Sequence, residues 1–414
     1  MKLECILESA CPRWKSKAMK NAQAKRYNHA LKQAGYNERP VLLLDQDAFD
    51  ANAAALRERA GTLPIRIASK SLRVRKALDR ALLTPGFHGV LCFTLAEALW
   101  LASQGYRDLV VAYPQADPEA ISRWAGSEQA REEITVMVDS RAQLELIDRV
   151  VPRHAPLKVA LELDAAYYPT ASLRIGAARS PLTDPEDLLT LAKHIAKHKR
   201  FELDGLMAYE SQIASVPDGG LAPKAWVARA LRRRSAAELA ERRAEAVQLV
   251  RGVADLRFVN AGGTGSFETT AQEQAVTELS AGSGLYAPAL FDGFRSFTPQ
   301  PALFMGFHVV RRPDEQTVAI LGGGWSASGP AGKDRLPVIE HPRKLKYLAL
   351  EAAGEVQTPL TGPAASRLKL GDTVWLRHAK AGEPAERVNR IAVFSKDKII
   401  DQWPTYRGEG KAFL

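Results

Sequence analysis

Short runs of apolar and β-branched residues recur between residues 65 and 286, and amphipathic helical patterns separate them. Near-continuous apolar strands that alternate with helices are typical of βαβ units and a parallel sheet. Eight such repeats predict an α/β fold, a closed (β/α)8 TIM-like barrel, rather than an open sheet. The eight runs are PIRIASK, GVLCFT, DLVVAYP, ITVMVDS, LKVALELD, LDGLMAYE, LRFVNAGG and AVTELSAGSGLY.

The strand–helix alternation stops near residue 300. The runs TVAILGGGW, GDTVWLRH and RIAVFSKDKIIDQWP follow one another through Gly, Pro and Asp turns without helical patterns between them. This part predicts a second, β-rich domain. We therefore expect a basic helical extension over 1–40, the barrel over 41–298 and the β-rich domain over 299–414. The early run PVLLLD precedes the barrel, and 41–47 are free to pair with the β-rich domain.

Composition is that of an ordinary globular chain, with 46% hydrophobic and 25% charged residues among 414. The three cysteines, Cys5, Cys11 and Cys92, have neither metal-site spacing nor the number for a disulfide framework. No run approaches the roughly 18 apolar residues of a membrane span, and the first forty residues lack a signal-peptide core. We expect a cytoplasmic protein that does not bind a membrane.

The formal net charge of +10 raises the question of nucleic acid. Basic residues gather in RWKSKAMKNAQAKR and in ARALRRRSAAELAERRAEAVQLVRG. The second segment mixes Glu among its arginines at helical spacing, which predicts a solvated helix with i,i+4 pairs. Neither segment carries interleaved aromatic residues or a nucleic-acid motif. The charge suits an anionic small-molecule ligand equally well, and we expect no nucleic-acid partner.

The first predicted barrel strand ends on Lys70, in RIASKSLR. A lysine at the end of a strand usually extends its charged group into solvent. A lysine held among polar groups away from water is also an amine nucleophile, because burial disfavours the ammonium form. The residue alone leaves both interpretations open.

Two glycine-rich turns follow the last two predicted strands, NAGGTGS at 260–266 and SAGSGLY at 280–286. Glycine lets backbone N–H groups approach an anion closely, and the loops after barrel strands seven and eight are a frequent phosphate site. Thr264 and Ser266 add hydroxyl donors. We therefore expect a phosphorylated ligand near Lys70. A phosphate at one rim and an amine at another is the geometry that holds pyridoxal phosphate as a Schiff base.

The chain as a whole resembles the alanine-racemase-like (fold type III) pyridoxal-phosphate enzymes. Within them it is most similar to the D-threonine aldolase and D-serine dehydratase branch, in the amino acid deaminase/aldolase subgroup. The resemblance covers nearly the whole length, and it implies that Lys70 holds the cofactor pyridoxal 5'-phosphate. It is carried by IRIASKS, GFHGVLCFTLAEALWLA, GLMAYESQIA, FVNAGGTGSFETT, TELSAGSGLYAP, LGGGWSASGPAGKDRLP and PTYRGEGKAFL.

The resemblance also implies roles for cofactor-binding residues. Arg174 in SLRIG matches the arginine beside the cofactor's phenolic oxygen, with a structural strand-end ion pair as the alternative. Tyr209 in MAYE matches the residue beside the pyridine ring, with simple packing as the alternative. Tyr286 belongs to the cradle or to the core. The phosphate cradle corresponds to Gly263, Thr264, Gly265, Gly282 and Ser283.

One departure from the family concerns the pyridine nitrogen. Alanine racemases place an arginine there, in an RPG segment, whereas the matching segment here is SAG and contributes Ser280. A cation beside the nitrogen keeps it unprotonated and limits its use as an electron sink. A neutral neighbour removes that restraint, which favours elimination or retro-aldol chemistry over racemisation.

A second departure concerns metal. Similar aldolases and dehydratases have a His followed two residues later by Asp or Cys, which bind a divalent ion. This chain has RHAKAGE, with His378 and then Lys380. An ammonium group cannot be a ligand, so we expect a metal-free site in which Lys380 supplies the positive charge or is simply exposed. His378 is the candidate acid/base group, or a satisfied histidine in a strand.

These observations predict a pyridoxal-phosphate-dependent lyase that cleaves or dehydrates β-hydroxy D-amino acids, and a homodimer with a small-molecule substrate. One alternative is an alanine-type racemase, for which Tyr406 in PTYRG from the other subunit is available as the second base. Another is a non-catalytic carrier of the cofactor, although such proteins generally lack a β domain. The substrate's side chain and configuration stay open.

Overall fold

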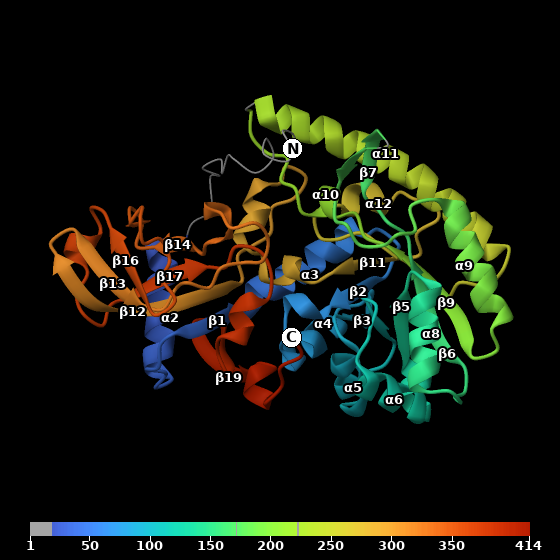
Figure 1. Cartoon of the computed structure of the whole chain (residues 1–414). Coiled ribbons are helices and arrows are strands. Elements are labelled where there is room, and N and C mark those ends of the chain that lie inside the picture. The colour runs from blue at the N-terminus through green and yellow to red at the C-terminus, as the bar shows by residue number, and fades with distance from the viewer. Residues whose placement is uncertain (1–18, 171, 222) are drawn as a thin grey trace.

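The computed structural model describes residues 19–170, 172–221 and 223–414, so part of the predicted N-terminal extension lies outside it. Two bodies lie side by side in Figure 1, a barrel surrounded by helices and a β-rich sheet. One apolar cluster of buried residues runs through the barrel shell and into the β-rich sheet. Among the described helices, none combines the length and hydrophobicity needed to cross a lipid bilayer.

The barrel is closed by eight strands in the order β10–β11–β2–β3–β4–β5–β6–β9. Every neighbouring pair is parallel. Each strand overlaps one of the eight predicted runs, although β3 and β9 each begin two residues before theirs, and the predicted fold is confirmed. The strands are β2 (Ile65–Ala68), β3 (Phe87–Cys92), β4 (Leu109–Val111), β5 (Ile134–Val138), β6 (Leu157–Glu162), β9 (Phe201–Ala208), β10 (Phe258–Ala261) and β11 (Glu278–Ala281).

Helices connect the strands and cover the outside of the barrel (Figure 1). Two of them begin at an Asp–Pro pair, in which Asp117 or Asp184 accepts hydrogen bonds from the first turn and the proline occupies a position that needs no donor. The helices are α3 (Gln46–Arg59), α4 (Arg75–Leu82), α5 (Leu95–Ser103), α6 (Pro118–Gly126), α7 (Glu128–Glu133), α8 (Arg141–Val150), α9 (Pro185–Lys197) and α11 (Pro223–Arg251), with single turns at α10 (Ser211–Ala214), α12 (Phe267–Thr270) and α13 (Ser283–Tyr286).

The predicted basic helix is α11, which runs along the upper edge of the barrel in Figure 1. Its Arg242 makes the expected i,i+4 pair with Glu238 at 2.7 Å. Arg243, however, is fully buried and donates to Glu210 at 3.0 Å. This helix is therefore solvated on one side only, because its other side covers the barrel and its inner arginine neutralises a buried carboxylate.

The second body is a nine-stranded sheet, and its centre is built from distant parts of the chain. β1 (Val41–Asp45) lies between β12 (Leu303–Asp314), with which it is antiparallel, and β18 (Arg390–Ser395), with which it is parallel. The first described helix, α2 (Asn21–Gln33), packs Tyr27 against the rings of Phe304, Trp375 and Phe394. The other strands are β13 (Thr317–Leu321), β14 (Val338–His341), β15 (Lys346–Tyr347), β16 (Gln357–Thr361), β17 (Thr373–Arg377) and β19 (Lys398–Pro404).

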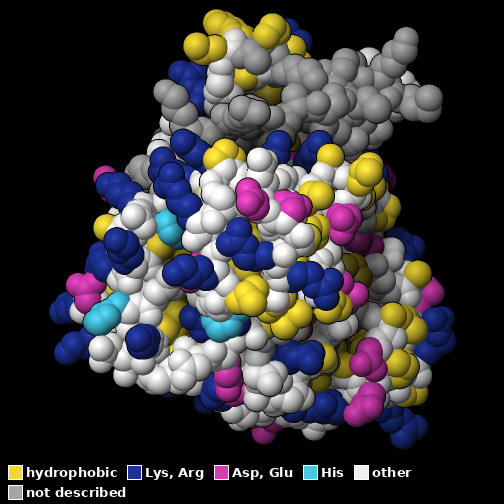
Figure 2. Space-filling view, turned by 90° about the vertical axis from the view of Figure 1, so that its left-hand side faces the viewer, with side chains coloured by type: hydrophobic (Ala, Val, Ile, Leu, Met, Phe, Trp, Pro, Cys, Tyr) yellow, Lys and Arg dark blue, Asp and Glu magenta, His cyan; other side chains and the backbone are white. Residues whose placement is uncertain are grey.

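Figure 2 shows one face of the molecule with its side chains coloured by type. On this face the Lys and Arg side chains are spread among acidic and apolar ones instead of forming one continuous stripe. The excess of basic residues is thus distributed over this surface.

Candidate active site

A cavity lies at the carboxyl ends of the barrel strands. Barrel enzymes build their active sites at this end. Its walls come from the segments that follow β2, β3, β4, β9, β10 and β11, together with Lys380 and Ala381 from the loop after β17. The β-rich body therefore supplies part of the wall of a cavity whose floor is the barrel.

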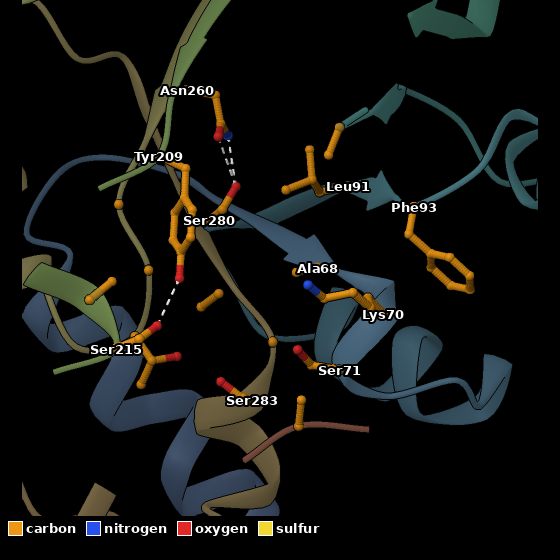
Figure 3. A pocket seen from close by; sticks show the side chains of 18 of the residues that line it. Ala68, Lys70, Ser71, Leu91, Phe93, Tyr209, Ser215, Asn260, Ser280 and Ser283 are labelled. Atoms are coloured by element: carbon orange, nitrogen blue, oxygen red, sulfur yellow. Dashed lines mark hydrogen bonds between the residues drawn. The ribbon is translucent and has the colours of Figure 1, made fainter. Parts of the chain in front are cut away.

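Lys70 lies inside this cavity (Figure 3). β2 ends at Ala68, and the single 3-10 turn Ser69–Ser71 then turns the lysine towards the barrel axis. Ser69 secures the turn by donating to the carbonyl of Leu91 at 3.1 Å. The amine of Lys70 lies 3.2 Å from the hydroxyl of Tyr113. The lysine is thus held among polar groups at the barrel mouth.

Both glycine turns reach the cavity, where Gly263, Thr264, Gly282 and Ser283 line it. A Cβ on Gly282 would clash with the carbonyl oxygen of Ala68, and one on Gly263 would lie 2.9 Å from a ring carbon of Tyr209. The two turns are tied together, since the Thr264 hydroxyl accepts from the N–H of residue 284 at 3.2 Å. Only glycine, which has no Cβ, allows these turns to lie so close to their neighbours.

Gly265 and Tyr286, which were predicted for the same cradle, do not line the cavity. Gly265 faces the carbonyl of Ala214 and the ring of Phe294 instead. Tyr286 is fully buried and donates to the carbonyl of Leu72 at 3.3 Å, so it belongs to the core. The phosphate cradle therefore consists of fewer residues than the sequence motifs predicted.

Ser280 lies on the cavity floor and pairs with Asn260 (Figure 3). The Asn260 amide donates to the Ser280 hydroxyl at 2.8 Å, and that hydroxyl donates back at 3.0 Å. Asn260 also donates to Glu278 at 2.8 Å. Burial alone would raise the pKa of Glu278, but Arg66 and His88 lower it to about 2. On the cavity floor, the polar group that a ligand meets is the neutral hydroxyl of Ser280. The negative charge of the Glu278 carboxylate beneath it is balanced by Arg66 and His88. Asn260 was not predicted, although it opens the NAGGTGS motif.

Two tyrosines and an arginine form another wall of the cavity. The guanidinium of Arg179 lies 5.0 Å from the ring centre of Tyr209 and 5.3 Å from that of Tyr113. The Tyr209 hydroxyl contacts that of Ser215 at 3.1 Å. Arg179 also lies 3.8 Å from Glu162, a weak ion pair. Tyr209 was predicted, whereas Tyr113 and Arg179 were missed.

Arg174 does not line the cavity. It lies on a hairpin of β7 (Tyr167–Thr170) and β8 (Leu173–Ile175). There it forms an ion pair with the buried Asp164. Arg174 is thus in a structural ion pair, which was the alternative interpretation of this residue. The arginine that lines the cavity is Arg179.

His378 follows β17 and is fully buried behind the cavity wall. Its ring lies edge-on to Tyr286, and neither ring nitrogen has a hydrogen-bond partner among the described residues. Burial, followed by the charge of Arg377, lowers the pKa of His378 to about 3. The structure thus contradicts His378 as an acid/base group of this cavity, because the ring neither reaches it nor titrates near neutrality.

Lys380, two residues further on, does line the cavity. Burial lowers its pKa, and Arg335 and Lys70 lower it further. The loop reaches this far because Gly382 has no side chain: a Cβ there would lie 2.5 Å from the carbonyl oxygen of Lys70. Within the described part of the chain, no group of three or more His, Cys, Asp or Glu has metal-binding geometry.

Comparison with known proteins places the chain in a family. The family model "Alanine racemase, N-terminal domain" matches residues 44–289. A curated relative, 3-hydroxy-D-aspartate aldolase of Paracoccus denitrificans, is 28% identical over 254 residues. This match covers 60% of this chain and 60% of the length of that relative.

Two solved structures are similar in fold over nearly their whole length. D-threonine aldolase from Filomicrobium marinum has a TM-score of 0.72 at 19% identity, covering 90% of this chain and 95% of that one. D-threo-3-hydroxyaspartate dehydratase from Delftia sp. HT23 has a TM-score of 0.67 at 19% identity, covering 89% and 97%. At these identities the likeness is one of fold alone.

The residues present fit pyridoxal 5'-phosphate, which the family implies as cofactor. One cavity is lined by the amine of Lys70, by two glycine turns in which a Cβ would clash, and by hydroxyl groups from both turns. These are the groups that an aldehyde and a phosphate require. Pyridoxal 5'-phosphate is thus the cofactor, and the chain belongs to the alanine racemase N-terminal domain family.

Proposed function

We propose that the protein is a pyridoxal-phosphate-dependent lyase that acts on β-hydroxy D-amino acids, by retro-aldol cleavage or by dehydration with loss of ammonia. The observation that carries the proposal is the neutral Ser280–Asn260 pair on the cavity floor, combined with a cation, Lys380, on the wall. The aldolase and dehydratase activities named for the similar proteins point to the same class of substrate.

The cofactor, when bound, withdraws electrons from the α-carbon of the amino acid attached to it. The chain's own residues then have distinct tasks. Lys70 would hold the cofactor's aldehyde carbon, and the turns at Gly263 and Gly282 would hold its phosphate. Ser280 would offer a neutral hydroxyl to the ring nitrogen, which would leave that nitrogen free to carry a proton.

Lys380 has the task that depends most on the substrate. Among the described residues its ammonium group takes part in no recorded hydrogen bond or ion pair, and it faces the cavity. An unpaired cation in a partly desolvated wall stabilises negative charge that develops on an oxygen. In retro-aldol cleavage the β-hydroxyl becomes such an oxygen when it gives up its proton, before the Cα–Cβ bond breaks. In dehydration it becomes one as hydroxide departs. We assign this role to Lys380, without a divalent ion.

The function is tested with purified protein and a panel of D- and L-amino acids, with and without a β-hydroxyl. We expect aldehyde and glycine, or keto acid and ammonia, from β-hydroxy D-amino acids and none from their L-isomers. Deuterium exchange at Cα with inversion of configuration, and no cleavage product, would establish a racemase instead. Cofactor binding without either reaction would establish a carrier.

We further propose that the working unit is a cytoplasmic homodimer that takes only small molecules. Lyase chemistry at an α-carbon needs water excluded, and the mouth of a barrel is open. Beyond Ser215, which lines the cavity, the chain exposes apolar side chains, among them Trp226 at 65% and Leu221 at 90%. A second copy covering them would close the entrance. Light scattering tests this: a monomeric mass at a concentration that gives full activity would contradict the dimer.

A further inference from the structure

Glu210 is a buried carboxylate that binds the first glycine turn, residues 260–266. It follows the end of β9 by two positions and is 1% exposed. Its side chain accepts from the N–H of Gly262 at 3.2 Å and from the hydroxyl of Ser266 at 2.7 Å. Glu210 itself does not line the cavity. No role follows for this residue from the sequence motifs.

Ser266 extends this contact into the turn. Its single hydroxyl proton has two acceptors in reach, and the charged carboxylate of Glu210 at 2.7 Å is nearer and stronger than the carbonyl of Gly263 at 3.3 Å. The same hydroxyl accepts from the N–H of Gly263 at 3.0 Å. Ser266, which the motif suggested as a hydroxyl donor to phosphate, is therefore engaged with Glu210 and does not line the cavity.

The anchored Ser266 sets the direction of the next peptide group. Its N–H donates to the carbonyl of Gly263 at 2.9 Å. The C=O and the N–H of a trans peptide point in opposite directions, so this bond also fixes the N–H of Thr264. Thr264 lines the cavity, and among the described residues its N–H has no recorded partner. A free backbone N–H at such a turn is a donor for an anion.

The charge of Glu210 is balanced by Arg243. A carboxylate bonded to this turn would repel a phosphate if its charge were not balanced. Arg243 is fully buried and donates to Glu210 at 3.0 Å. The carboxylate can therefore accept from the turn without leaving a net negative charge beside it.

We propose that Glu210 is a positioning residue for the cofactor's phosphate. It holds the turn, directly at Gly262 and through Ser266, so that the N–H of Thr264 is directed at the phosphate. This inference rests on the proposed function, since it assumes that the turn holds the phosphate.

The chain contains a matched comparison in Glu273. Arg243 donates to this carboxylate with its other terminal nitrogen. Within the described part of the chain, no contact between the Glu273 side chain and the turn is recorded. The two carboxylates thus share one arginine, but only Glu210 reaches the turn.

The test compares pyridoxal 5'-phosphate with pyridoxal, which lacks the phosphate. Titration of full-length, cofactor-free protein, followed by absorbance, gives both dissociation constants, and their ratio isolates the contribution of the phosphate. A change that only loosened the barrel would weaken both aldehydes alike and leave this ratio in place. In Glu210→Gln the preference for the phosphorylated form should fall by about tenfold, the lower end of the usual cost of removing a residue that orients ligand-binding groups. Glu273→Gln should keep the wild-type preference.

An effect of charge alone has the opposite sign, because removing a negative charge near an anion would raise the preference. A raised or unchanged preference in Glu210→Gln would overturn the inference. So would an equal fall in Glu273→Gln, which would trace the effect to Arg243. If wild-type protein binds the two aldehydes equally well, the phosphate cradle of the proposed function fails, and the inference fails with it.

Should Glu210→Gln fail to fold, Ser266→Ala and Thr270→Val serve instead. Each removes one hydroxyl that donates to the same oxygen of Glu210, but only Ser266 belongs to the turn. Ser266→Ala alone should lower the preference severalfold, in keeping with the loss of one hydrogen bond to a charged group. Equal preferences in these two variants would overturn the inference.

Discussion

The hydroxyl of Tyr406 donates a hydrogen bond to the carboxylate of Glu97 at 3.0 Å, across 309 positions of sequence. Tyr406 is 1% exposed, and its ring lies edge-on to that of Trp100 at 4.9 Å. The C-terminal segment is therefore fastened to α5 of its own barrel. In the racemase alternative, Tyr406 of another subunit is the second base. The contact with Glu97 contradicts that role, since the phenol is already bonded and enclosed.

The same contact predicts a pH dependence of stability. Burial raises the pKa of Glu97 from 4.5 to about 7, although the N–H of Phe93 and the hydroxyl of Tyr406 donate to its carboxylate. Between these two values the folded chain binds more protons than the unfolded chain, so the stability from this group falls as the pH rises. The side chain introduced by Glu97→Gln stays neutral, so the stability of this variant should not fall on account of this group as the pH rises. Relative to wild type, its free energy of unfolding should gain on the order of 3 kcal/mol at most across that window and then level off.

Urea unfolding measured from about pH 5 to about pH 8 checks this prediction. Because other groups titrate alike in both proteins, the difference between variant and wild type isolates Glu97. A difference that stays flat over this range would show that the carboxyl is ionised throughout.

Lys70→Ala should abolish the absorption band of the lysine-bound cofactor. The cavity is lined by one further lysine, Lys380, which comes from a different loop. Borohydride reduction of the wild type, followed by peptide mass spectrometry, should place the cofactor on residue 70. Lys76→Ala is the control, since Lys76 pairs with Asp401 on the outer surface. A reducible adduct in the Lys70→Ala variant would refute the assignment.

Lys380→Met should lower kcat/KM for a β-hydroxy substrate by about 10²–10³-fold, the usual loss when one electrostatic partner of a developing anion is removed. The variant keeps the aliphatic stem and loses only the charge, so the band of the bound cofactor should be unchanged. Lys333→Met, on an exposed turn, is the control. Exhaustive chelation should leave wild-type activity intact, and activity that returns only on addition of a divalent ion would reject the metal-free proposal.

Gly282→Ala should weaken cofactor binding at least tenfold, which corresponds to about 1.4 kcal/mol. The added Cβ would clash with the carbonyl of Ala68 and lie 2.9 Å from the Cβ of Ser71, so the turn must move out of the cradle. Gly126→Ala is the control, because nothing lies within 4 Å of a Cβ placed there. Titration of cofactor-free protein gives both dissociation constants, and equal values would show that the turn does not bind phosphate.

The barrel was predictable because each strand and helix is encoded locally. The run that ends on Lys70 and the two glycine turns lie at strand ends, and the order of parallel strands places such ends together. Arg174 was misassigned because its position depends on a hairpin and on Asp164, which no periodicity reveals.

The remaining site residues differ in how far the sequence pattern could reveal their positions. Tyr113 ends a predicted strand run, DLVVAYP, so its place at the mouth was available from the pattern. Arg179 lies in a loop without periodicity, and only the folded chain brings it over two rings. His378 carried a motif-like spacing, but its burial depends on the packing of Tyr286 from the barrel.

The place of β1 between β12 and β18 has a consequence for how the chain is made. Val41–Asp45 emerges from the ribosome early, yet both of its hydrogen-bonding neighbours lie beyond residue 300. Until they arrive, this apolar strand has two unpaired edges, which are templates for association with other chains. Contacts at such a sequence separation also slow folding. The barrel can form during synthesis, whereas the β-rich sheet must wait until Arg390–Ser395 has been made. A fragment that begins after β1 would leave β12 and β18 without the strand that joins them.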